Sequence, residues 1–69
     1  MPDVIIKEFT AGRFNIEMRI TNRYGLNYYE VTANEERGGM YYRINHYQSP
    51  VRANALKAFA RYKRNVLQE

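Results

Sequence analysis

The sequence contains few side chains that could serve a reaction or hold a metal ion. It has one histidine, His46, one serine, Ser49, and no cysteine. A nucleophile needs a neighbouring base and a third group that orients the base, and a zinc site needs three or four converging ligands. A lone histidine facing a core is typical of a packed, hydrogen-bonded side chain. We therefore expect no catalytic residue, no cofactor and no metal, and interpret the chain as a non-enzymatic binding protein.

Two further patterns bear on chemistry. Glu17 and Glu30 are candidates for cross-strand neighbours, and paired carboxylates could do acid–base work. The alternative is a structural role, in which Glu17 and Glu30 form surface ion pairs with Arg19 and Arg43 that contribute about 0–1 kcal/mol each. Gly38-Gly39 precedes an expected strand rather than a helix, so it lacks the context of a phosphate-binding loop.

The first candidate binding surface is a row of cations on an expected helix. Lys57, Arg61 and Arg64 are spaced i, i+4 and i+7, which places them on one face. Like charges at this spacing repel, whereas neutralisation of phosphates releases counterions and favours such a cluster. A solvated, solubilising helix face would show the same pattern. The row therefore predicts a phosphate-binding surface or a solubilising one.

The net positive charge of the chain lies in the same segment as this row of cations. The formal net charge is +4. The charged residues of 1–48 cancel, so the whole excess lies in residues 49–69. Arginine outnumbers lysine, which suits planar, bidentate recognition of phosphate or carboxylate.

The second candidate surface is the outer face of an expected sheet. Three tyrosines, Tyr28, Tyr41 and Tyr47, are predicted to share it with Arg19 and Arg43. Aromatic rings among arginines stack unpaired bases and hold a nucleic-acid backbone, and the same residue types are enriched at protein-binding hot spots. They also form cross-strand pairs that simply stabilise a sheet. A one-residue slip in strand parity would replace these tyrosines with the set Tyr24, Tyr29 and Tyr42.

Four strands and one helix must position these side chains. β-branched and aromatic residues with period-2 alternation predict strands at about 3–10, 14–21, 26–34 and 40–47. A segment without Gly or Pro predicts a helix at about 50–67, with Ser49 as its N-cap and Pro50 at the first helical position.

Periodicity also predicts which side chains face the core. In the second strand these are Phe14, Ile16, Met18 and Ile20, and in the third Tyr29, Val31 and Ala33. In the fourth they are Met40, Tyr42, Ile44 and His46, since this choice avoids burying Arg43. The helix is predicted to bury Leu56, Phe59, Ala60, Val66 and Leu67. In the first strand Val4/Ile6 and Ile5/Phe9 are both plausible.

Short connections between successive strands favour an antiparallel meander, and the helix's apolar stripe should cover one face of it. The expected fold class is therefore a single two-layer α+β domain of the order β-β-β-β-α, with three or four strands in the sheet. In layout only, it is similar to the small DNA-binding domains that insert a sheet into the major groove, such as the arm-binding domains of phage-type recombinases.

No apolar run approaches the roughly 20 residues that span a bilayer, and no signal peptide is apparent. The absence of cysteine favours the cytoplasm. We expect a small nucleic-acid-binding module, or an accessory of a nucleic-acid-handling complex. The alternative is a protein-interaction or inhibitor module of phage or mobile-element type, docking on a larger host protein. The sequence leaves open whether the chain is a monomer or a dimer.

Overall fold

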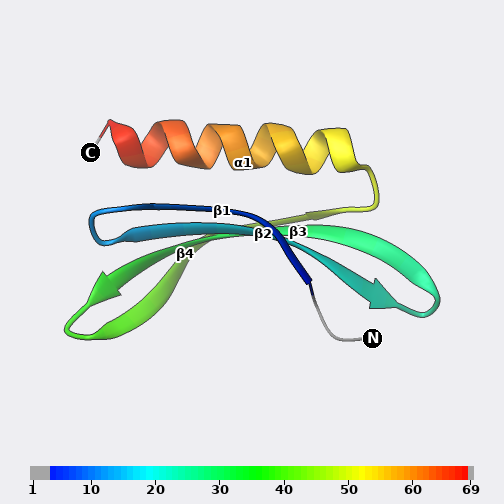
Figure 1. Ribbon diagram of the computed structural model, residues 1–69, viewed down its shortest axis with the longest axis horizontal. Helices are drawn as coiled ribbons and strands as arrows, with labels where there is room; N and C mark the ends of the chain where they lie inside the picture. Colours follow the sequence, from blue (N-terminus) through cyan, green and yellow to red (C-terminus); the bar gives the residue numbers. More distant parts are fainter. Residues whose placement is uncertain (1–3, 69) are drawn as a thin grey trace.

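Four strands pair in sequence order and one helix follows them. The computed structural model describes residues 4–68. Its elements are β1 (Val4–Ala11), β2 (Phe14–Arg23), β3 (Leu26–Arg37), β4 (Met40–Ser49) and α1 (Arg52–Leu67). All neighbouring strands are antiparallel, in the order β1-β2-β3-β4. Figure 1 shows α1 lying across one face of this sheet, which we call the helix side, while no helix or strand of residues 4–68 covers the opposite face, which we call the open face. The predicted α+β meander is confirmed. Asp3, the first residue of the predicted first strand, lies outside the described residues.

β3 and β4 are longer than the sequence predicts. The segment Glu35–Arg37 lies beyond the predicted end of the third strand at about residue 34, but in the structure it extends β3 as far as a two-residue turn at Gly38 and Gly39. Both glycines have positive φ, +59° and +84°, which is the geometry of the tight hairpin turn that matches strand twist. Glu35 can remain in the strand because Arg13 and Arg37 neutralise it there.

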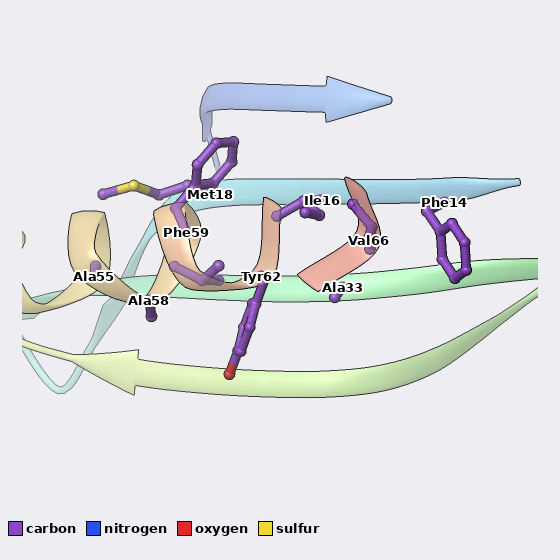
Figure 2. Close-up of a cluster of buried hydrophobic side chains, with 10 residues drawn as sticks. Phe14, Ile16, Met18, Ala33, Ala55, Ala58, Phe59, Tyr62 and Val66 are labelled. Carbon is purple, nitrogen blue, oxygen red and sulfur yellow. The ribbon is translucent and has the colours of Figure 1, made fainter. Parts of the chain in front are cut away.

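The core lies between α1 and the two central strands. Ile16, Met18 and Val31 are fully buried, and burial of each side chain contributes about 1.5–3 kcal/mol. In Figure 2 the labelled side chains of α1 lie over the sheet from Ala55 to Val66, with Phe59 beside Met18 and Tyr62 directed towards β4. The predicted inward faces of β2 and β3 are confirmed by the burial of Phe14, Ile16, Met18, Val31 and Ala33. In β1 it is Phe9 that packs against the core.

The buried stripe of α1 differs from the predicted one. Phe59 and Val66 are buried as expected, whereas Leu56, Ala60 and Leu67 are exposed. The stripe is completed by Ala55, Ala58 and Tyr62. The prediction favoured the largest aliphatic residues. In the structure, two alanines allow the helix to approach the sheet, and the tyrosine ring fills the space beside them towards β4 (Figure 2).

The predicted helix cap is also corrected. α1 begins at Arg52, after Val51, and no side chain caps it. A residue before proline is biased to extended backbone, so Ser49 is the last residue of β4. Its hydroxyl accepts a hydrogen bond from the Val51 amide at 3.0 Å.

A bulge in β4 overturns the predicted parity of its second half. Ala33 pairs with Asn45 and Asn34 pairs with Arg43, so Ile44 is an extra residue in β4. A bulge interrupts strict alternation. His46, expected to face the helix, therefore pairs with Thr32 on the open face, and Tyr47, expected on the outer face, pairs with buried Val31 on the helix side.

The helix stripe can be tested by two truncations. Phe59→Ala should destabilise the protein by about 3–5 kcal/mol, because it leaves a cavity at the centre of the core. Leu56→Ala should cost less than about 1 kcal/mol, because Leu56 is 36% exposed. Urea unfolding followed by circular dichroism gives both values. Equal losses, or a larger loss for Leu56→Ala, would contradict the observed stripe.

Candidate nucleic-acid interface

The two sides of the molecule differ in charge. Strand register places both signs on the open face, with Arg19, Arg23 and Arg43 against Glu8, Glu17, Glu30 and Glu36. The helix side carries one carboxylate in residues 4–68, Glu35, which pairs with the core residue Phe14. All five cations of α1 belong to this side of the molecule: Arg52, Lys57, Arg61, Lys63 and Arg64. The positive charge is therefore concentrated on the helix layer.

The arginines of the sheet are largely neutralised by glutamates. Arg19 contacts Glu17 at 3.1 Å, and Arg23 lies 3.9 Å from Glu30. Arg13 and Arg37 both bind Glu35, at 2.7 and 2.6 Å. Among the predicted site residues, Arg19 is thus engaged in an ion pair on its own strand, whereas no ion pair in residues 4–68 involves Arg43.

The cations of α1 have no such partners. The helix contains no acidic residue between Arg52 and Leu67, and no ion pair within residues 4–68 involves any of its cations. Lys57, Arg61 and Arg64 are exposed, and they span about 10 Å along the helix axis at 1.5 Å per residue. The predicted row of cations is therefore available for an anionic ligand.

The structure brings one predicted tyrosine to this row. Tyr47 lines a groove between β4 and α1 together with Asn54, Lys57, Ala58 and Arg61, and the groove has a volume of about 190 Å³. The Arg61 guanidinium lies 5.5 Å from the ring centroid of Tyr62, a cation–π distance that restrains it. Two surfaces that the sequence treated as separate thus share one site, which we call the α1–β4 groove.

The other two predicted tyrosines lie far apart on the open face. Tyr28 pairs with Thr21 near the β2–β3 turn, and Tyr41 pairs with Glu36 near the β3–β4 turn. Tyr28 and Glu36 are eight residues apart along β3, or about 26 Å at 3.3 Å per residue. Each tyrosine lines its own depression, so Tyr28 and Tyr41 do not form one stacking platform.

The middle of the open face carries carboxylates as well as arginines. Glu8 pairs directly with Glu17 across β1 and β2, and Glu30 Oε2 lies 2.9 Å from His46 Nε2. The sequence suggested Glu17 and Glu30 as neighbours, but they pair with Thr32 and Arg19 respectively. A phosphate backbone crossing this face would meet carboxylates between the two tyrosines, which disfavours the open face as the polyanion site.

The residues first considered for catalysis do not converge. His46 lies on the open face, whereas Ser49 pairs with Tyr29 on the helix side. Across residues 4–68, no three His, Cys, Asp or Glu side chains gather closely enough to hold a metal ion. Within the same range, no helix is both long and apolar enough to cross a membrane.

Comparison of the chain with models of protein families, with curated proteins and with solved structures finds no match.

The buried carboxylate of Glu35 gives a test of the electrostatic pattern. Hydrogen bonds from Arg37 and Arg13 lower the pKa of Glu35 from its ordinary value of 4.5. A carboxyl group whose pKa is lower in the folded state stabilises the fold above its unfolded pKa, and this contribution is lost as the pH falls through the folded pKa.

The Glu35→Gln variant should therefore be less stable than wild type near neutral pH, and its stability should fall less between about pH 5 and pH 2. Urea unfolding at several pH values measures this difference. Glu36→Gln is the matched control, since Glu36 is exposed and has no ion pair within residues 4–68. Parallel pH profiles for wild type and Glu35→Gln would contradict the assignment.

Proposed function

We propose that this protein is a small nucleic-acid-binding module, or an accessory of a nucleic-acid-handling complex, which holds a phosphate backbone along α1 and in the α1–β4 groove. The observation that carries the proposal is that the cations of α1 lack acidic partners in residues 4–68, while most arginines of the sheet are paired with glutamates. Lys57, Arg61 and Arg64 contact phosphates, and Tyr47 offers an aromatic ring to a base.

The cost of this arrangement to the helix supports a binding role. Arg52 opens the first turn, where no acidic residue is present, and a cation there opposes the helix dipole by about 0.3–1 kcal/mol. Lys57 and Arg61 repel each other at i, i+4 by a few tenths of a kcal/mol. A helix face that served only solubility could include glutamates and so avoid both the unfavourable dipole interaction and the repulsion between cations. A bound polyanion would reduce the repulsion between the cations.

A second candidate, a protein-interaction or inhibitor module, is favoured by a different observation. Met40, Tyr41 and Tyr42 at the start of β4 are each 47% exposed or more. Apolar side chains exposed on an edge strand suit addition of a partner strand. An aromatic interface of this kind should depend weakly on salt, whereas phosphate contacts depend on it steeply.

Fluorescence anisotropy with labelled single- and double-stranded oligonucleotides at about 50 and 200 mM salt tests the first proposal. Three phosphate contacts give a salt slope of about −2.1 for a single strand and −2.7 for a duplex. Affinity should therefore fall about 20- to 40-fold over this range. The triple variant Lys57→Ala/Arg61→Ala/Arg64→Ala should lose both the binding and the slope.

The matched control removes three charges from the open face, as Arg19→Ala/Arg23→Ala/Arg43→Ala, and should keep most of the affinity. Loss of binding in this control with retention in the helix variant would move the site to the sheet. An absence of binding at micromolar protein and low salt would refute a nucleic-acid role and direct attention to protein partners.

A further inference from the structure

The first half of β4 exposes the largest apolar side chains of a sheet edge. Met40 is 62% exposed, Tyr41 60%, Tyr42 47% and Ile44 40%. β4 pairs with β3 on one side only, because it is the last strand of the sheet. Figure 1 shows the β3–β4 hairpin bending away from α1, so the helix leaves this part of the strand uncovered. Among these side chains Tyr42 contacts Arg37, whose guanidinium lies 5.9 Å from the ring centroid, and the free edge beside them has no partner strand within residues 4–68.

The two edges of the sheet differ in their protection against strand pairing. β1, the opposite edge, also exposes Val4, Ile5 and Ile6, but it carries Lys7 and Glu8 next to a bulge between Ile5 and Lys7, and charges and bulges block the approach of another strand. The first half of β4 has Arg43 as its one charged residue. Its bulge falls at Ile44 and leaves Met40 to Arg43 in regular register with β3.

We propose that β4 pairs antiparallel with β4 of a second copy of this chain, about a two-fold axis at Tyr42. In this register Tyr42 lies opposite Tyr42 of the second copy and Tyr41 opposite Arg43, so the pairing is centred on the regular segment before the bulge at Ile44. The two four-stranded sheets join into one eight-stranded sheet. The interface is isologous, so it closes at two copies and leaves the β1 edges outermost.

Electrostatic repulsion disfavours the register that is centred on Arg43 instead of Tyr42. If the axis passed through Arg43, two guanidinium groups would lie directly opposite each other, and like charges at cross-strand positions are destabilising. With the axis at Tyr42, each Arg43 instead faces a tyrosine ring, which is a favourable cation–π arrangement. The two Tyr42 rings meet at the axis, and aromatic pairs stabilise antiparallel strands.

The pairing has a consequence for the α1–β4 groove, and this part of the inference rests on the proposed function. Antiparallel edge pairing puts the two-fold axis perpendicular to the sheet, so both helices lie on the same side. The groove of each copy, lined by Tyr47, Lys57 and Arg61, then lies on the same side of the joined sheet as the groove of the other, displaced from it by about 30 Å along the strands. A nucleic-acid strand between the two helices would meet cations from both copies.

The oligomeric state without nucleic acid tests the pairing. Light scattering after size exclusion, at about 10 and 100 µM protein, should give twice the chain mass of 8.3 kDa. Tyr42→Lys places two ammonium groups opposite each other and should give a monomer. Leu26→Lys is the matched control, because Leu26 is 59% exposed near the β2–β3 turn; it should stay dimeric. Circular dichroism establishes that each variant is folded.

A cysteine pair tests the register. The chain has no native cysteine, so Tyr42→Cys should oxidise to a covalent dimer, whereas Tyr41→Cys, opposite Arg43, should not. Cross-linking of Tyr41→Cys in preference to Tyr42→Cys would overturn the register. A wild-type monomer at 100 µM, a higher oligomer, or a dimer that persists in Tyr42→Lys would overturn the pairing. Since no nucleic acid is present, none of these outcomes bears on phosphate binding by α1.

Discussion

Ala55 and Ala58 have side chains small enough for α1 to approach the sheet, and Phe59 and Tyr62 fill the space on either side of them (Figure 2). This packing sets the rotation of the helix about its axis. Once the stripe faces Ile16, Met18 and Val31, the cations at the other positions of α1 must lie on its flanks and its outer surface. The same rotation brings Lys57 and Arg61 beside Tyr47. The position of the candidate site is therefore a consequence of how the core is packed.

A second constraint comes from where the carboxylates lie. Glu17, Glu30 and Glu35 each contact an arginine of the sheet, so those arginines contribute little net field. α1 has no glutamate or aspartate of its own between Arg52 and Leu67. The positive potential of the protein is thus focused on one layer, and electrostatic focusing of this kind raises the local concentration of an anionic ligand.

Strand order and fold class were predictable because the signals were strong and local. Phe14 to Thr21 alternates strictly, and short glycine turns between strands left little room for any topology except a meander. Alternation could not predict which side chains of β4 face the helix, because the bulge at Ile44 reverses the parity of Tyr47 and His46. A bulge is set by how both strands of a pair fit together, and the sequence of one strand contains no direct sign of it.

The helix stripe shows a related limit. Leu56, Ala60 and Leu67 form an apolar row that Lys63 interrupts, whereas the buried row of Ala55, Ala58, Phe59, Tyr62 and Val66 is continuous; the prediction weighted the size of the aliphatic side chains above this continuity. The sheet surface decides between them, because it accepts the narrow row with two alanines. Lys57, Arg61 and Arg64 were correctly predicted to be exposed. The proximity of Lys57 and Arg61 to Tyr47 could not be predicted from the helix sequence, because it depends on where β4 places Tyr47.

The most direct test of the central claim, that a polyanion binds along α1 and the α1–β4 groove, is an NMR titration of ¹⁵N-labelled protein with a short single-stranded oligonucleotide at about 50 mM salt. The account predicts amide shift changes at Tyr47, Asn54, Lys57 and Arg61, with little change at Glu17 and Thr32 on the open face. Changes confined to the open face, or no changes along α1, would contradict it.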